Sequence, residues 1–185
     1  NKPFMDSEPR YEDHPACFKA EYGCYWSAQD VRNNAYWDMC EGACGHTYGN
    51  HCIWGFTTKP EPYFPFAWQE ALHHEGANQI RFLKELRLKR DFYSFRPAPE
   101  LAEDDDAIGG HIAAGRGEKY AYIYTPQGQP IRANLNLMGG NIIRASWFNP
   151  RTGEEIFYKL FPPKAALFAA PTHGEDWVLV LEIME

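Results

Sequence analysis

The first half of the chain alternates between strand-like and helix-like patterns, and this order limits the folds open to it. A short apolar run at residues 3–8 predicts a strand, and Ser27 is a typical N-cap for the amphipathic helix that follows. A second strand is predicted within residues 44–54, and a second helical stretch at 66–86 is interrupted around Gly76. A strand–helix–strand–helix order requires parallel strands with a right-handed crossover. Two strands alone do not form a stable parallel sheet, because such sheets are covered on both faces. We therefore expect elements outside this sequence to complete it.

The pattern changes near Pro97. The segment 97–106 contains two prolines and an acidic run, and it is predicted to be a linker. Residues 107–185 then show short strand patterns separated by turn signals, which is typical of a small antiparallel β-sandwich. The predicted strands cover residues 120–125, 131–137, 142–148, 155–160, 167–169 and 177–183.

Three tyrosines recur with period two in the first of these strands. Tyr120, Tyr122 and Tyr124 lie on one face of a strand. They are either the buried face of an ordinary strand, the interpretation we favour, or an aromatic platform for carbohydrate.

Composition excludes some partners. The net charge of −7 argues against nucleic acid, because neutralising phosphates requires a basic surface. No stretch is long and apolar enough to predict a membrane span. The chain has no signal-peptide pattern and does not begin with Met, so we expect a fragment or a processed piece.

Five cysteines lie within the first 52 residues, so at least one is unpaired within the chain. Buried thiols that act as small apolar residues are the favoured interpretation. A zinc site is a weaker alternative, because the spacing of its possible ligands fits no structural zinc pattern. Those ligands would be Cys40, Cys44, His46, His51 and Cys52.

Polar clusters follow both predicted strands of the first half. Glu8 ends the first strand, and Pro9 stops it because proline lacks an N–H group. Neighbouring strands of a parallel barrel present such clusters at one rim. Carboxylates, hydrogen-bonding side chains and tryptophan are typical of a sugar site. The candidate sugar-contacting residues are Arg10, Tyr11, Glu12, His46, Tyr48, Asn50, His51 and Trp54.

Three runs carry a family resemblance: residues 6–13, 42–54 and 147–154. They are similar to the C-terminal part of the apiosidase-like glycoside hydrolases, which are (β/α)8-barrel enzymes followed by a small β-sandwich. The resemblance implies that residues 1–96 are the last two βα units of the barrel. It also implies that the N-terminal part of the barrel, from the same protein, is the missing partner. Related C-terminal domains carry a collagen-binding label, but no residue here indicates collagen.

The resemblance further implies a retaining hydrolase of complex, plant-derived glycans, with Glu8 as the nucleophile. It implies no metal or organic cofactor, and it suggests a secreted or periplasmic protein. The acid/base residue of the family lies on an earlier strand, so we expect this chain alone to be inactive. The alternative function is a non-catalytic carbohydrate-binding module, carried by the sandwich and insensitive to Glu8→Gln.

Overall fold

The computed structural model describes residues 2–104 and 109–184. In the first half, β1 (Met5–Asp6) and β2 (Gly45–His46) are parallel neighbours, as the strand–helix–strand order predicted. Between them lie two short 3-10 turns, η1 (Ala16–Phe18) and η2 (Ala20–Tyr22), and the helix α1 (Ala28–Cys40). After β2 come α2 (His51–Trp54), α3 (Trp68–Ala71), α4 (Glu75–Leu88) and the turn η3 (Phe92–Ser94).

Local capping explains where α1 begins. The Ser27 side chain accepts a hydrogen bond from the Asp30 backbone N–H, and Asp30 accepts one from the Ser27 backbone N–H. This reciprocal pair satisfies two backbone donors that the first helical turn would leave unpaired. The helix therefore starts where the sequence predicted.

Two local predictions differ from the structure. Residues 51–54, expected in the loop after the second strand, form the helix α2, because the Asn50 side chain caps the backbone N–H groups of Cys52 and Ile53. Gly76 lies inside α4 and does not interrupt the helical stretch, since the break falls between α3 and α4. A side chain at position 76 would collide with the Glu12 carboxylate, so this glycine allows a close approach between elements.

The second half contains two antiparallel sheets. A six-stranded sheet has the order β3 (Arg96–Pro97), β4 (Ala113–Arg116), β5 (Tyr120–Thr125), β10 (Trp177–Met184), β7 (Ile142–Phe148) and β8 (Glu155–Phe161). A two-stranded sheet pairs β6 (Ile131–Asn134) with β9 (Ala165–Phe168). The turns η4 (Pro99–Leu101) and η5 (Leu135–Leu137) complete the half. The chain is thus a mixed α/β structure with antiparallel sheets.

The described part of the predicted linker is folded into the second half of the chain. Pro97 belongs to β3, which pairs with β4, and Ala98 and Leu101 are buried in the core between the two sheets. We predicted neither β3 nor β4, and Leu135–Leu137, predicted as strand, forms the turn η5. Residues 105–108, with the end of the acidic run and the start of the predicted sandwich, lie outside the described residues.

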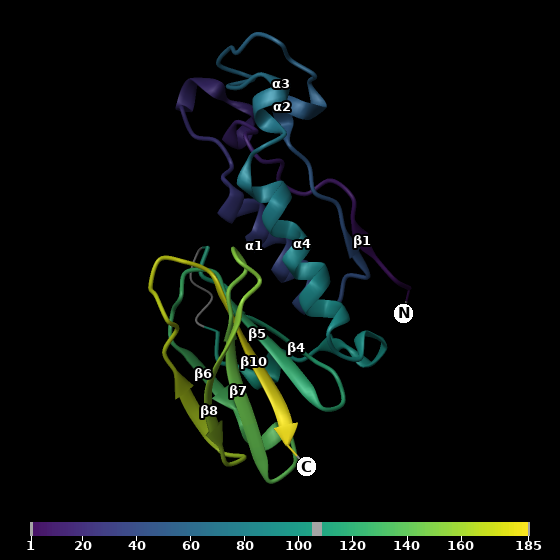
Figure 1. The fold of residues 1–185 in the computed structure, drawn as a ribbon, viewed down its shortest axis with the longest axis vertical. Coiled ribbons are helices and arrows are strands. Elements are labelled where there is room, and N and C mark those ends of the chain that lie inside the picture. The colour runs from purple at the N-terminus through teal and green to yellow at the C-terminus, as the bar shows by residue number, and fades with distance from the viewer. Residues whose placement is uncertain (1, 105–108, 185) are drawn as a thin grey trace.

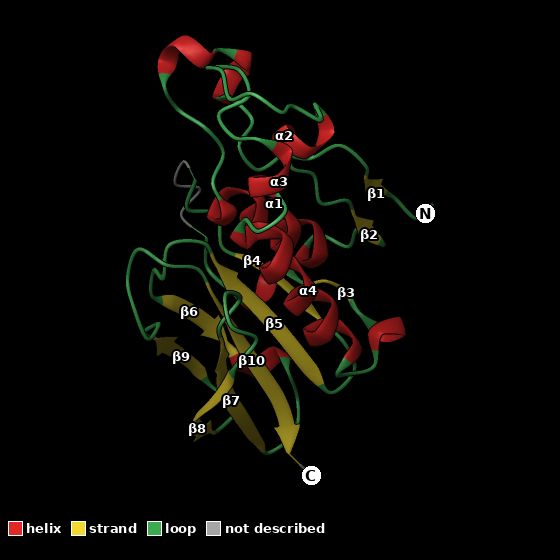
Figure 2. Ribbon diagram, turned by 45° about the horizontal axis from the view of Figure 1, so that its top comes forward, coloured by secondary structure: helices red, strands yellow, loops and turns green. Residues whose placement is uncertain are grey.

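Two hydrophobic cores lie on opposite faces of the six-stranded sheet. One lies between this sheet and the β6–β9 pair, and it includes Ile131, Phe168 and Leu179. The other lies between the sheet and the helices α1 and α4, which cross over β4 and β5 (Figure 1). Figure 2 shows the same layers, with both helices between β1–β2 and the large sheet.

The tyrosine stripe belongs to the second core. Tyr120, Tyr122 and Tyr124 are at most 4% exposed, and each hydroxyl donates a hydrogen bond inside the protein. The Tyr122 hydroxyl reaches the Leu86 carbonyl at the end of α4 at 2.8 Å. The stripe is therefore a packing surface for the helices, and the alternative of an exposed carbohydrate platform is wrong. No helix in the described ranges has both the length and the hydropathy that a membrane crossing requires.

Candidate functional site

The loops that follow β1 and β2 run side by side. The Glu12 N–H donates to the Gly49 carbonyl at 2.9 Å, and the His51 N–H donates to the Glu12 carbonyl at 2.8 Å. Glu12 and Asn50 form an isolated parallel bridge, so the pairing of the two strands is resumed beyond their ends. This pairing brings together side chains that lie about forty residues apart in the sequence.

An open cavity of about 670 Å³ lies against these loops. Five of the nine predicted site residues line it, and seven of its eleven lining residues carry an aromatic or imidazole ring. The predicted residues are Glu8, Arg10, Tyr11, His51 and Trp54, and the others are Pro9, His14, Cys17, Phe18, Trp26 and Tyr63. The cavity thus offers flat apolar walls with a few polar groups, which suits a ring-shaped, hydroxyl-bearing ligand.

Glu8 and Arg10 supply the charge of the cavity. The Glu8 residue is exposed, and its backbone N–H donates to Asp6 Oδ1 at 3.2 Å, which fixes the chain just beyond β1. The Arg10 guanidinium lies 4.5 Å from the ring centre of Trp26. In the described part of the chain, neither Glu8 nor Arg10 forms a salt bridge. Both groups are therefore free to interact with a ligand.

His51 forms a buried part of the wall. Its ring stacks on Phe64 at 4.4 Å and lies parallel to Trp54 at 6.1 Å. Burial, and secondarily the neighbouring imidazole of His14, lower the pKa of His51 from 6.5 to about 4. His51 is therefore neutral near pH 7, and its buried Nε2 atom has no hydrogen-bond partner among the described residues.

Glu12 and Tyr48 face away from the cavity. Glu12 is 4% exposed, and its carboxylate accepts hydrogen bonds from the Tyr48 hydroxyl at 2.5 Å and from the Gly76 N–H at 3.2 Å. Burial, followed by the Glu12 carboxylate, raises the pKa of Tyr48. These contacts join both loops to the start of α4.

Asn50 and His46 are likewise engaged inside the protein. Besides capping α2, Asn50 donates to Asp13 Oδ2 at 2.6 Å, and the same oxygen lies 2.6 Å from His74 Nδ1. His46 Nδ1 lies 2.6 Å from Asp38 Oδ2 on α1. The structure thus does not bring Glu12, His46, Tyr48 and Asn50 to the cavity.

Sequence reasoning did not assign the remaining lining residues. His14 belongs to the polar loop after β1, where a signal was present. Tyr63 lies in a proline-rich segment, and Phe18 ends the turn η1, where both Cys17 and Phe18 have positive φ. Neither segment has a sequence pattern that indicates a wall position. Only the packing of the loops reveals that these rings meet.

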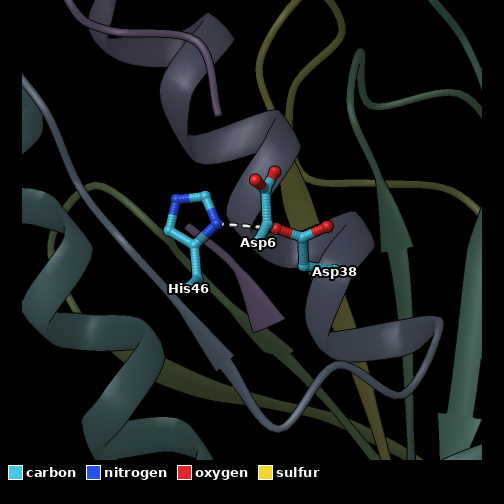
Figure 3. Close-up of side chains that lie close together, drawn as sticks. All are labelled: Asp6, Asp38 and His46. Carbon is cyan, nitrogen blue, oxygen red and sulfur yellow. Dashed lines mark hydrogen bonds and ion pairs between the residues drawn. The ribbon is translucent and has the colours of Figure 1, made fainter. Parts of the chain in front are cut away.

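One group of side chains could hold a metal ion. Asp6, Asp38 and His46 offer ligand atoms within 4.8 Å of one another (Figure 3). In Figure 3 the His46 nitrogen that faces the carboxylates is the one already bonded to Asp38. No cysteine belongs to this group, and Cys40 and Cys52 are buried. In the part of the chain that the structure describes, no three of the ligands imagined for zinc come together.

Comparison with known proteins defines the class. Two solved structures resemble 98% of the chain: one named "Glycoside hydrolase", with a TM-score of 0.92 and 28% identity, and a glycoside hydrolase family 5 protein from Bacteroides vulgatus ATCC 8482, with a TM-score of 0.90 and 29% identity. The chain has the fold of the matched part of these glycoside hydrolases, and it spans 42% of the length of each. No match was found among curated proteins.

The family follows from two further matches. Residues 1–94 match the family model "Apiosidase-like, catalytic domain", and residues 97–182 match "Putative collagen-binding domain of a collagenase". The first match covers just over half of the chain. The chain belongs to the apiosidase-like family.

Proposed function

We propose that this chain is the C-terminal part of a retaining glycoside hydrolase and that Glu8 is its nucleophile. The observation that carries the proposal is the position of Glu8. It lies two residues beyond a parallel strand, on a cavity walled by aromatic rings, in a chain of a glycoside hydrolase family. Residues 1–96 would be the last two βα units of a (β/α)8 barrel, whose active site lies at the carboxyl ends of its strands.

The cavity provides one of the two carboxyl groups that a retaining hydrolase requires. Retaining hydrolysis uses two carboxyl groups about 5–5.5 Å apart, one as nucleophile and one as acid/base. Glu8 is the only carboxylate among the described residues that line the cavity. We therefore propose that the acid/base residue comes from the N-terminal part of the same protein and that this chain alone is inactive.

Sugar binding is assigned to the other cavity residues. Tyr11 and Trp54 offer rings on which the C–H face of a sugar can stack, while Arg10 and His51 offer polar contacts. Glu12, Tyr48 and Asn50 would support the site by holding the two loops together, and His46 would support it by joining β2 to α1. The substrate class we propose is a complex, plant-derived glycan.

Residues 107–185, called the β-domain below, are proposed to stabilise residues 1–96, which carry Glu8. The tyrosine stripe of the β-domain is covered by α1 and α4, so these three rings are not available to a ligand. No observation favours collagen binding, or carbohydrate binding by this domain.

Reading the coding sequence upstream of Asn1 is the first test. An in-frame extension that encodes the earlier βα units would agree with the proposal, whereas a stop codon or an unrelated domain there would contradict it. In the protein that includes this extension, Glu8→Gln should abolish hydrolysis, and Glu118→Gln, at an exposed site in the β-domain, should not. A fluorinated glycoside that traps the glycosyl-enzyme should label the peptide that contains Glu8.

A further inference from the structure

His14 is held rigidly in the cavity wall. Its Nδ1 atom lies 2.8 Å from the carbonyl oxygen of Pro15. Its ring makes edge-to-face contacts with Phe18 at 4.6 Å, His51 at 4.4 Å and Tyr63 at 6.1 Å. The direction in which the ring presents its second nitrogen is therefore fixed before any ligand arrives.

The backbone contact also fixes which nitrogen carries the proton. A carbonyl oxygen only accepts hydrogen bonds, so Nδ1 of His14 must be the donor. In the neutral ring, Nε2 then keeps its lone pair. Among the described residues no group donates to this atom, and it is not shut off from the cavity that His14 lines. His14 thus presents an unused acceptor.

His51 gives the acceptor a neighbour. It is 2% exposed, it lines the same cavity, and its Nε2 atom is buried without a partner. A buried polar atom without a partner is unfavourable, so a hydroxyl group that reaches Nε2 when the wall adjusts around a ligand would remove this cost. The hydroxyl group of a sugar can donate or accept, and it therefore suits either tautomer of His51.

We propose that His14 is a substrate-binding residue whose Nε2 atom accepts a hydrogen bond from a sugar hydroxyl, next to a second hydroxyl contact at His51. This inference rests on the proposed function and adds to it the group that the site recognises: neighbouring hydroxyls on a sugar ring whose C–H face meets the aromatic wall.

The first measurement needs no ligand. In the 185-residue chain labelled with ¹⁵N, two-bond ¹H–¹⁵N spectra of the imidazoles near neutral pH distinguish the tautomers. The inference expects a protonated Nδ1 and an unprotonated Nε2 for His14. A neutral His14 with its proton on Nε2 would overturn the inference, whether or not the proposed function is correct.

The second measurement is binding of oligosaccharides released from plant cell-wall polysaccharide, followed in the same spectra. Saturation should shift the Nε2 resonance of His14. His14→Phe keeps the ring contacts and removes the nitrogen, and it should weaken binding roughly two- to tenfold, the loss expected for one hydrogen bond. His73→Phe, at an exposed histidine outside the cavity, is the matched control and should bind like the parent.

The outcomes separate the two ideas. Binding to the parent with unchanged affinity in His14→Phe would overturn the role of His14 and leave the proposed function standing. If the parent chain binds none of the oligosaccharides, the role of His14 is overturned, whereas the proposed function is decided separately by Glu8→Gln in the protein that includes the N-terminal part of the barrel. Should His14→Phe fold poorly, the tautomer in the unsubstituted protein still decides the matter.

Discussion

Arg32 on α1 and Asp176, the residue before β10, form a fully buried ion pair between the two halves of the chain. Two guanidinium nitrogens reach the two carboxylate oxygens at 2.8 and 3.0 Å, and Asp176 is completely buried. Burial lowers the pKa of Arg32, but the Asp176 contacts outweigh it and the pKa is raised overall. The pair joins α1 to the start of the inner strand β10.

Breaking this pair should destabilise the protein strongly. Arg32→Met leaves the buried Asp176 carboxylate with Arg151 as its remaining charged partner. We expect a loss of about 3 kcal/mol in the free energy of unfolding, the lower end of the range for breaking a buried ion pair. Chemical denaturation measures this change in the free energy of unfolding. Arg132→Ala, which removes an exposed ion pair with Glu103, should cost at most about 1 kcal/mol. Equal effects of the two substitutions would contradict the finding that the buried pair matters.

Gly76→Ala should also destabilise, although alanine normally favours a helix by about 1 kcal/mol over glycine. The added methyl group would meet the Glu12 carboxylate and lie 3.1 Å from a Val31 methyl carbon. We expect a net loss of about 1–3 kcal/mol, as for an overpacked core. Ala77→Ser, at the next position of α4, is the control. A gain in thermal stability for Gly76→Ala would show that Glu12 moves aside freely.

His51 should make the protein less stable in mild acid. Its pKa is lowered to about 4 in the folded state from 6.5, so between these pH values the unfolded chain binds the additional proton. Stability should therefore fall as the pH falls from about 6.5 towards about 4. His51→Phe keeps the stacking on Phe64 and should flatten this part of the profile of melting temperature against pH. His73→Phe should leave the profile unchanged.

The five thiols should fall into two classes. Cys17, Cys24 and Cys44 are exposed, whereas Cys40 and Cys52 are buried. A thiol reagent such as Ellman's reagent should therefore modify three cysteines in the native protein and the other two only after unfolding. Burial raises the pKa of both buried thiols, which slows them further. Rapid modification of all five would mean that α1 and α2 open readily.

Ligand binding should protect one of the exposed thiols. Cys17 lines the cavity, whereas Cys24 and Cys44 do not. In a Cys24→Ser, Cys44→Ser double variant, an oligosaccharide that occupies the cavity should slow the modification of Cys17. Modification at the same rate, under conditions where binding is detected independently, would place the ligand elsewhere.

Features that depend on near neighbours in the sequence could be predicted without the structure. The Ser27–Asp30 capping box, the apolar run of β10 and the proline that follows Glu8 each act within a few residues, so their consequences were predictable. The strand–helix–strand order also indicated the parallel pairing of β1 and β2, because a helix is the usual connection between parallel neighbours. Glu8 was found as a cavity residue for the same reason.

Contacts between distant parts of the chain decide which polar residues line the cavity and which form hydrogen bonds inside the protein, so the structure was needed to assign them. Glu8 and Glu12 lie four residues apart in one loop, yet Glu12 is buried because Tyr48 and the Gly76 N–H, both distant in sequence, satisfy its carboxylate. The alternation of Tyr120, Tyr122 and Tyr124 fixed that they share a face, but not that helices from the other half cover it. Such outcomes depend on long-range packing, which local periodicity does not encode.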